Sequence, residues 1–222
     1  MNNINPDVFC YRIKNDPSLS KNVHLISLYN GWKKSWFSLF QDMNNEAFCS
    51  SDEFSRQDYF LALFLNKKLA GSIGLREIDV STEIGRDDSY IQPWPESFIL
   101  QKTDKKILLM SGFNLDEEFR GRFLKVPSMF IFGTFIMKNF IESHNSSLIT
   151  LARNDAGVNK FCSAFGATKV GFKESFHGKD CDLMEFQKEN VKFYPLKRLK
   201  EIIPTPYIED YKDISIKEAI GA

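Results

Sequence analysis

The first third of the chain alternates between two hydrophobic patterns, one with the period of a helix and one typical of strands. Residues 24–40 place large apolar side chains three and four positions apart, which predicts an amphipathic helix. Gly31 lies inside this run and could interrupt the helix, because glycine is a poor helix former. The polar residues 66–68 between two apolar runs predict a hairpin turn. The expected strands are Val8–Ile13, Tyr59–Leu65 and Leu69–Val80, and a short helix is expected at Asp52–Gln57.

The second half of the chain alternates strands with helices. Ile107–Leu115 is an apolar run of strand length, and Pro127–Ser143 predicts a helix in which Pro127 is the first helical residue. This order is typical of an α/β (α+β) fold, in which helices flank a mixed, partly parallel sheet. The remaining expected elements are a strand at Leu148–Ala152, a helix at Asp155–Phe165 capped by Asn154 or Asp155 and ended by Gly166, and a hairpin of Thr168–Phe176 with Cys181–Gln187.

Two stretches lack this regularity. Residues 79–106 show little periodicity, so we expect a long loop without regular structure, of the kind that is often functional or mobile. A simpler interpretation of this loop is a surface excursion pinned by Trp94. Residues 191–222 are charged and contain three prolines, which predicts an extension that packs on the domain or trails from it. We therefore expect one domain at residues 1–190 and a C-terminal extension at residues 191–222.

Composition supports a folded domain and excludes few partners. Apolar residues make up 43% of the 222 positions and 21 of them are phenylalanine, enough for a sizeable core. The chain has 29 basic and 29 acidic residues, so its net charge gives no global attraction to nucleic acid, and no nucleic-acid partner is expected.

Cysteine usage and hydropathy point to a reduced, cytoplasmic protein. The four cysteines form no CxxC pair and no histidine stands near them at the spacing of metal ligands, so we expect free thiols and no metal. The N-terminus does not read as a signal peptide, and no apolar run reaches the ~18 residues of a membrane-spanning helix. The sequence does not indicate an oligomeric state.

The segment before the helix predicted to begin at residue 127 has features of an anion-binding site. The first amides of a helix have no partner within the helix and lie at the positive end of its dipole. Arg120, Arg122 and Lys125 stand just ahead of that helix and add positive charge. A phosphate or pyrophosphate would fit such a site, although solvated basic residues explain the same pattern.

The order of elements in residues 107–171 gives this segment a context. A strand is followed by Phe-Arg-Gly-Arg at residues 119–122, a helix, a second strand, Asn154, a short helix and then Gly166-Ala167. This stretch resembles the GCN5-related N-acetyltransferase (GNAT) superfamily, in which such a loop and helix cradle the pyrophosphate of coenzyme A. The resemblance implies a centrally splayed sheet, with acetyl-CoA or another acyl-CoA as the donor.

The same resemblance assigns residues to the donor site. Two residues depart from the superfamily's loop motif. Phe123 stands where the superfamily usually has glycine, and Lys125 stands where it usually has glycine or alanine. The bulk of Phe123 could narrow the backbone's approach to a pyrophosphate, and Lys125 could replace a backbone contact with a charge. The donor-binding residues expected from the resemblance are Phe113, Asn114, Leu115, Arg120, Gly121, Arg122, Phe123, Leu124, Lys125, Asn154 and Phe161.

The catalytic groups are less clear from the sequence. The superfamily's frequent general acid is a tyrosine on the short helix, and Cys162 stands at that position, where it is an acid candidate or a core cysteine. A base that accepts the amine's proton could be Glu77, or Glu117 or Glu118 in the loop. Backbone amides at residues 113–115 could polarise a thioester carbonyl if a bulge splays the strand.

A second resemblance concerns the acyl donor. Residues 71–76 and the long segment at 79–106 are loosely similar to acyl-homoserine-lactone synthases and N-acyl amino acid synthases, which share the fold and often take long acyl chains from acyl carrier protein. We expect an N-acyltransferase that moves an acyl group, acetyl first, from a pantetheine thioester to a small-molecule or protein amine by direct attack. The alternatives are a long-chain N-acyl synthase using acyl carrier protein or acyl-CoA, and a catalytically silent binding or regulatory module of the same fold.

Overall fold

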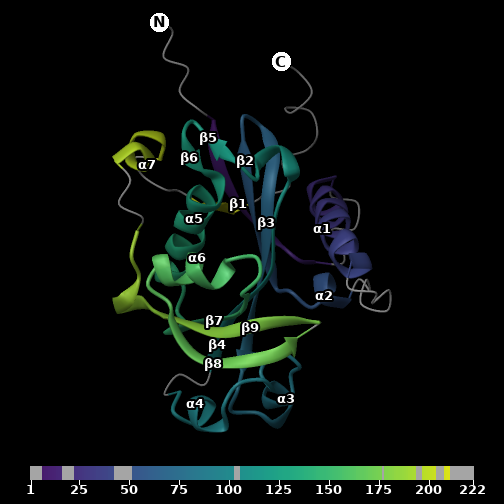
Figure 1. Ribbon diagram of the computed structural model, residues 1–222, viewed down its shortest axis with the longest axis vertical. Helices are drawn as coiled ribbons and strands as arrows, with labels where there is room; N and C mark the ends of the chain where they lie inside the picture. Colours follow the sequence, from purple (N-terminus) through teal and green to yellow (C-terminus); the bar gives the residue numbers. More distant parts are fainter. Residues whose placement is uncertain are drawn as a thin grey trace, which may run out of the picture.

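A large mixed sheet forms the centre of the molecule in the computed structural model, which describes residues 7–16, 23–42, 52–102, 106–176, 178–193, 197–203 and 208–210. The eight strands lie in the order β10-β1-β2-β3-β4-β7-β9-β8 (Figure 1). Their bounds are β1 (Val8–Lys14), β2 (Tyr59–Leu65), β3 (Lys68–Asp79), β4 (Lys106–Leu115), β7 (Ser147–Arg153), β8 (Thr168–Phe176), β9 (Lys179–Gln187) and β10 (Ile208–Asp210).

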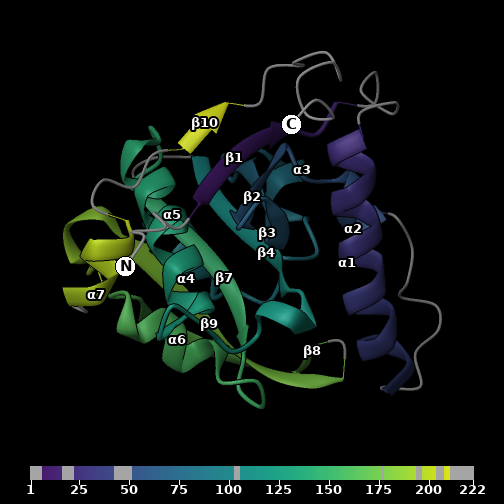
Figure 2. The same ribbon diagram turned by 90° about the horizontal axis from the view of Figure 1, so that it is seen from above.

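Helices cover both faces of this sheet. In both views α1 and α2 lie on one side, while α5, α6 and α7 lie on the other (Figures 1 and 2). A two-stranded hairpin of β5 (Arg122–Phe123) and β6 (Val126–Pro127) precedes α5. The helices are α1 (Val23–Asp42), α2 (Asp52–Ser55), α3 (Glu83–Arg86), α4 (Glu96–Leu100), α5 (Ser128–Glu142), α6 (Val158–Ala164) and α7 (Lys197–Ile202).

In β2 and the first half of β4 the residues are almost continuously apolar, because both faces of these strands are covered. On β4, Leu108 and Met110 belong to the core under α5, whereas Ile107 and Leu109 belong to a second core with Trp94. The strand β2 divides in the same way between the α5 side and a third core built on α1. The α/β class and the mixed sheet flanked by helices are thus confirmed.

The sheet opens at its centre. The strands β4 and β7 are parallel and pair over a short stretch, in which Leu108 pairs with Leu148 and Leu109 with Ile149. Beyond these pairs the strands diverge, although β4 continues to Leu115 and β7 to Arg153. The splayed sheet expected from the family resemblance is therefore present, and the opening lies between the carboxyl ends of two parallel strands.

A bulge bends β4 beside this opening. Ser111 and Asn114 are three positions apart on β4, whereas their partners on β3, Gly74 and Ser72, are only two positions apart. The extra residue lies at Gly112, whose φ of +64° is the left-handed conformation that favours glycine. A bulge leaves its residues out of the regular ladder, so backbone groups near residues 112 and 113 are released from pairing with β3.

The segment between β3 and β4 is more regular than expected. It contains the short helices α3 and α4, so the prediction of a long loop without regular structure is wrong. Trp94 is 5% exposed and stacks on Phe98 of α4 with ring centroids 4.9 Å apart, as the pinned-excursion interpretation required. Lys102 pairs with the buried carboxylate of Glu185 and fixes the far end of the segment to β9. Apolar anchors of irregular spacing explain why periodicity did not reveal these helices.

Two helix predictions need correction. The helix α1 runs through Gly31 without a break. The second helix, α6, begins at Val158 and not at Asp155, because residues 154–157 form a turn that ends in Gly157 with φ of +68°. Neither Asn154 nor Asp155 caps it, since their side chains bond to Asp182 and Arg153 instead.

The C-terminal segment packs on the domain where it is described. Leu199 and Ile203, in and just after α7, are buried in the main core, and β10 pairs in parallel with β1. The division of the chain at residue 190 stays a prediction.

Candidate active site

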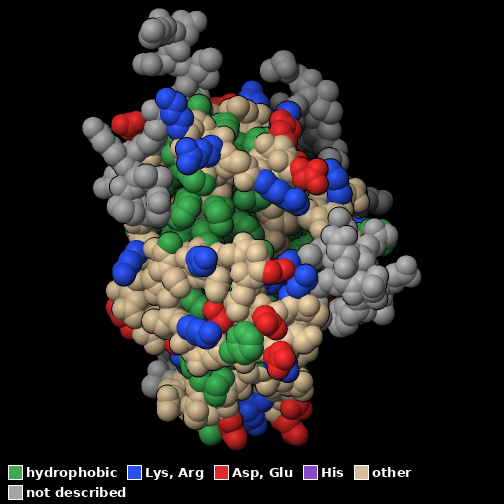
Figure 3. Space-filling view, viewed as in Figure 1, with side chains coloured by type: hydrophobic (Ala, Val, Ile, Leu, Met, Phe, Trp, Pro, Cys, Tyr) green, Lys and Arg blue, Asp and Glu red, His purple; other side chains and the backbone are tan. Residues whose placement is uncertain are grey.

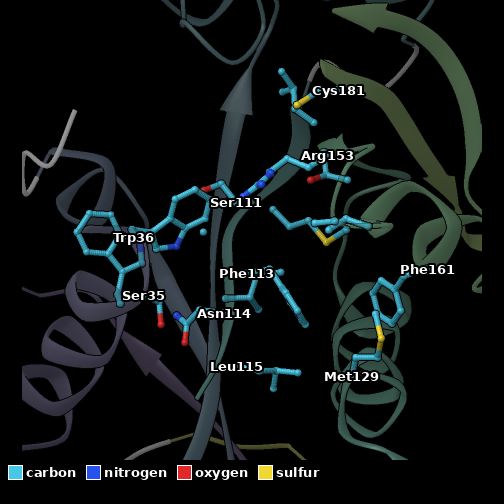
Figure 4. A pocket seen from close by; sticks show the side chains of 18 of the residues that line it. Ser35, Trp36, Ser111, Phe113, Asn114, Leu115, Met129, Arg153, Phe161 and Cys181 are labelled. Atoms are coloured by element: carbon cyan, nitrogen blue, oxygen red, sulfur yellow. The ribbon is translucent and has the colours of Figure 1, made fainter. Parts of the chain in front are cut away.

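A cavity of about 520 Å³ occupies the opening of the sheet. The carboxyl half of β4 forms one wall and the end of β7 forms another (Figure 4). Figure 4 shows Trp36 and Ser35 of α1 on one side, and Phe161 of α6 and Met129 of α5 on the other. The cavity therefore joins both helical layers to the bulged strand.

The approach of α5 to α6 shapes one side of this cavity. A Cβ added at Gly133 would meet Phe165 and Phe161 ring atoms at 2.6 and 2.7 Å, so only glycine allows the two helices to pack this closely. Phe161 and Phe165 pack with ring centroids 5.0 Å apart. Met129, Ile136 and Phe161 line the cavity here and make this end apolar.

Polar groups surround the middle and the opposite end. Ser111 on the bulged strand and Thr150 on β7 line the middle. Asn114 is fixed by a 2.7 Å hydrogen bond from its Nδ2 to the Ser72 hydroxyl. Figure 4 places Leu115 and Met129 toward one end of the cavity and Arg153 and Cys181 toward the other.

The structure brings together about half of the predicted donor residues. The side chain of Arg120 is 56% exposed, and its Nε donates to the carbonyl oxygen of Leu115 at 3.1 Å, so this cation stands at the mouth beside β4. The predicted residues that line the cavity are Phe113, Asn114, Leu115, Arg120, Phe161 and Cys162.

The loop after Arg120 differs from the expected phosphate-binding loop, and Gly121, Arg122, Phe123, Leu124 and Lys125 are not among the residues that line the cavity. They form a hairpin in which Arg122 pairs with Pro127 and Phe123 with Val126. Leu124 and Lys125 have φ of 49° and 72°, the pair of left-handed residues that a tight two-residue turn requires. The amide of Ser128 donates to Gly121 at 3.1 Å, so the first amide of α5 is also occupied.

Asn154 is not among the residues that line the cavity. Its Nδ2 donates to Asp182 at 3.3 Å, and Asp182 also accepts from Asn159 and pairs with Lys169. These contacts tie the turn before α6 to β9, so Asn154 has a positioning role in the structure.

Cys162 lines the cavity but is poorly suited to proton transfer. Its side chain is fully buried in the main core, and burial raises the pKa of the thiol to about 12. A departing pantetheine thiolate has a conjugate acid near pKa 8.5, so transfer of the Cys162 proton to it would be uphill by roughly 5 kcal/mol. The geometry favours the core interpretation over the acid interpretation.

Glu77 lies outside this cavity. It lines a separate pocket with Tyr59, Asn139 and His144. One of its oxygens pairs with Lys106 at 2.8 Å and the other with His144, and the hydrogen bond from Lys106 is the main cause that lowers the pKa of this carboxyl.

The loop carboxylates differ in their positions. Glu117 lines the cavity at its mouth, whereas Glu118 pairs with Lys68 at 2.8 Å on an exposed surface. Of the three glutamates considered as bases from the sequence, Glu117 alone lies at the cavity.

Sequence reasoning missed several lining residues. Trp32 and Trp36 read as core positions of a helix, yet both face the cavity as well. The polar end is formed by four residues from different parts of the chain. They are Glu53 of α2, Tyr90 of the segment between α3 and α4, Arg153 of β7 and Lys179 of β9. No local motif marks them, because the fold alone brings these distant segments together.

The surface around α5 is apolar with a charged border. Figure 3 shows hydrophobic side chains over α5 and beside α6, with Lys and Arg side chains and some Asp and Glu side chains around them. Leu124 in the hairpin is 42% exposed, and Phe123, Met129 and Phe130 are partly buried nearby in the chain.

The described residues contain no group of three or more His, Cys, Asp or Glu that could hold a metal ion. Within the same residues, no helix is both long enough and apolar enough to cross a bilayer.

Comparison with known proteins identifies the fold. No protein-family model and no curated protein matches the sequence. The structure is similar to FeeM, an N-acyl amino acid synthase from uncultured soil microbes, at a TM-score of 0.55 and 14% identity, covering 84% of this chain and 93% of FeeM.

Two further structures extend the likeness. BjaI, a CoA-dependent acyl-homoserine lactone synthase with SAM and isopentyl-CoA, matches at a TM-score of 0.62 and 9% identity, covering 92% of this chain and 94% of BjaI. The aminoglycoside acetyltransferase AAC(6')-Ib in complex with coenzyme A and kanamycin matches at a TM-score of 0.51 and 11% identity, covering 90% of this chain and 100% of the acetyltransferase. All three are acyltransferases, and the chain has the GNAT fold that they represent.

Proposed function

We propose that this protein is an N-acyltransferase that moves an acyl group from a pantetheine thioester to an amine by direct attack. The observation that carries the proposal is the cavity between β4 and β7, with the bulge at Gly112 in its wall. An extended pantetheine chain has amide groups that suit the edge of β4 where its pairing with β7 has ended.

The bulge supplies the electrostatic part of the reaction. Backbone N–H groups near Gly112 and Phe113, released from the ladder, are suited to donate to the oxygen of a thioester carbonyl. The amine nitrogen forms a bond to the carbonyl carbon, and the tetrahedral intermediate then breaks its C–S bond. The pantetheine thiolate leaves, and water or a cavity carboxylate takes the proton that the amine loses.

Arg120 and the first turn of α5 are the best candidates to hold a donor phosphate. Arg120 is the predicted basic residue that lines the cavity, and helix N-termini favour anions. Lys125, at the tip of the hairpin, does not line the cavity and has no role in this proposal.

The lining favours an acyl group longer than acetyl as an alternative substrate. Met129, Ile136 and Phe161 present an apolar wall that suits a longer acyl chain. The donor in this form is a longer acyl-CoA or an acyl carrier protein, whose pantetheine carries no adenosine for the hairpin to grip. The exposed apolar surface over α5, with Lys and Arg side chains in its border, suits an acidic carrier protein.

Thermal stability in the presence of coenzyme A, acetyl-CoA and a long-chain acyl-CoA tests the proposal. A ligand at one hundred times its Kd stabilises the folded state by about 2.7 kcal/mol, a shift that is easily measured. Arg120→Ala should lower the shift for all three ligands, whereas Lys125→Ala, the matched control, should leave it unchanged. No shift with any ligand would reject a coenzyme-A donor and favour a carrier-protein donor or a catalytically silent module.

A further inference from the structure

The end of the cavity away from Leu115 carries charges of both signs. Arg153 ends β7 and Lys179 begins β9, and both side chains line the cavity. Glu53 lines the same end, where its Oε2 accepts the hydroxyl of Tyr90 at 2.6 Å. The Tyr90 ring meets the ring of Phe176, the register partner of Lys179, with centroids 5.6 Å apart. These contacts connect the acidic and basic groups into one polar end.

Arg153 is held in place by a neighbouring carboxylate. Its Nε and Nη2 donate to the two oxygens of Asp155 at 3.0 and 2.8 Å. Its Nη1 has no partner among the residues that the structure describes, and 23% of the side chain is exposed. Figure 4 shows the side chain extending from β7 toward Ser111 across the cavity. Asp155 therefore fixes the guanidinium plane, and the remaining N–H groups are ready to bind without a further loss of rotamer freedom.

The cations at this end face the cavity, while the nearby carboxylates lie behind them. Asp155 also pairs with Lys179 at 3.5 Å, so two cations share one carboxylate. Asp155, Asp180 and Asp182 do not line the cavity, and Asp182 is paired with Lys169 at 2.6 Å. The surface that a bound molecule meets beside β7 and β9 is therefore positive, although the cluster as a whole is balanced.

Across this end, Glu53 faces the cavity with its charge only partly offset. Arg56 pairs with Glu53 at 3.4 Å but also with Asp88 at 2.9 Å. A molecule with one anionic and one cationic group would meet Arg153 with the first and Glu53 with the second. The rings of Trp36, Tyr90 and Phe176 also line the cavity and suit an apolar side chain.

We propose that the acceptor is an amine that also carries a carboxylate, as an amino acid does, and that the carboxylate binds Arg153 with Lys179 as a second cation. This inference rests on the proposed acyl transfer and names the class of its acceptor. Arg153 and Lys179 are then specificity-determining residues, because an amine without a carboxylate leaves their charges without a ligand.

Binding without any donor tests the inference separately from catalysis. Calorimetry would compare matched pairs: glycine with methylamine, L-leucine with isopentylamine, and L-phenylalanine with 2-phenylethylamine. At least one amino acid should bind ten times or more tightly than its partner amine. In Arg153→Gln, that affinity should fall by roughly 10- to 100-fold, the usual effect of losing a hydrogen bond to a charged group. Equal binding within every pair would overturn the inference.

Two further variants keep the test informative if Arg153→Gln fails to fold. Arg153→Lys keeps the charge but loses the planar fork, so amino-acid affinity should lie between that of the wild type and that of Arg153→Gln. Lys179→Gln should weaken binding a few-fold, whereas Lys173→Gln, an exposed lysine on the same hairpin, should not change it. Unchanged affinity in both Arg153→Lys and Lys179→Gln would also overturn the inference.

Thiol release from acyl-CoA then separates the two proposals. Amino-acid binding without thiol release from any donor would contradict the proposed transfer while leaving the acceptor class supported. Release with 2-phenylethylamine as fast as with L-phenylalanine, and an unchanged KM for amino acids in Arg153→Gln, would contradict the acceptor class alone. The last comparison is between succinyl-CoA and butyryl-CoA as donors. If Arg153→Gln lowers the rate of thiol release from succinyl-CoA but not from butyryl-CoA, Arg153 binds a carboxylate of the donor, and the inference is overturned.

Discussion

Gly112 holds the backbone of β4 in a conformation that other residues rarely adopt. Its φ is +64°, and a Cβ at this position would lie 3.2 Å from Nε1 of Trp32 on α1. The residue therefore serves two purposes, because it allows the bulge and it leaves room for the helix that closes the cavity. The amides that the proposed reaction needs depend on this one glycine.

Replacing Gly112 by alanine should affect activity more than stability. The left-handed conformation costs a non-glycine residue about 1–2 kcal/mol, which should lower Tm by several degrees. Displacement of an oxyanion donor should lower kcat by roughly 100-fold. Gly121→Ala is the matched control, since nothing lies within 4 Å of an added Cβ and its φ is not positive. Full activity in Gly112→Ala would argue against a role for the bulge.

For Cys162, in contrast to Gly112, we expect that substitution leaves the catalytic rate unchanged. Because its pKa is raised to about 12, the thiol is neutral and a weak acid at any working pH. Cys162→Ala should keep the wild-type pH profile of kcat and lose only roughly 1 kcal/mol of stability from the small buried cavity. Loss of the alkaline or acidic limb of that profile would restore Cys162 as the acid.

At the scale of elements, an ion-pair group joins three parts of the chain. Glu77 on β3 binds Lys106 at the start of β4 and His144 after α5. These contacts lie where β4 and β7 still pair, before the sheet opens. They hold the closed end of the opening while its other end diverges.

Glu77→Gln should therefore show a stability loss that depends on pH. The folded-state pKa of Glu77 is lowered, chiefly by Lys106, so its stabilisation is present above the unfolded pKa near 4.3 and is lost as pH falls through the folded pKa. The variant should be less stable than the wild type by about 0.5–1 kcal/mol at pH 7 and equal to it near pH 2–3. Urea unfolding at both pH values measures this, and a pH-independent difference would show that packing is responsible.

Sequence reasoning succeeded for elements with a strong period and failed where turn geometry or distant contacts decide. The strands β2, β3, β4 and β9 were predicted to within about two residues, because buried apolar residues recur along each of them. The hairpin at Leu124 and Lys125 was missed since neither residue is the glycine or asparagine that usually marks such a turn. That turn is also why, in the predicted donor loop at residues 120–125, Arg120 lines the cavity and the residues after it do not.

At the scale of the whole molecule, the candidate site is assembled from segments far apart in the chain. Its walls come from α1, α2, β4, α5, β7, α6 and β9 together with the segment before β4. Arg153 and Glu53 both line it although a hundred positions separate them, so no local motif could predict that they share a site. What the sequence could predict was the scaffold, because its order of elements is local information.

The C-terminal segment should belong to the same cooperative unit. Leu199 is 4% exposed within the main core. Leu199→Ala should cost about 2–4 kcal/mol of unfolding free energy, as large-to-small core substitutions do, and the exposed Glu201→Ala should cost about 0.5 kcal/mol or less. Chemical denaturation with a single transition would measure both values. Wild-type stability in Leu199→Ala would show that the segment is dispensable.

Detection of an N-acylated product by mass spectrometry tests the central claim most directly. The protein would be incubated with an amino-acid mixture and acetyl-CoA, octanoyl-CoA, dodecanoyl-CoA or the corresponding acyl carrier protein thioesters. The account predicts an N-acyl amine formed in equal amount to the released thiol, with a sharply reduced rate in Gly112→Ala. Absence of product with every thioester and amine, from protein that is folded, would contradict acyl transfer and identify the cavity as a binding site only.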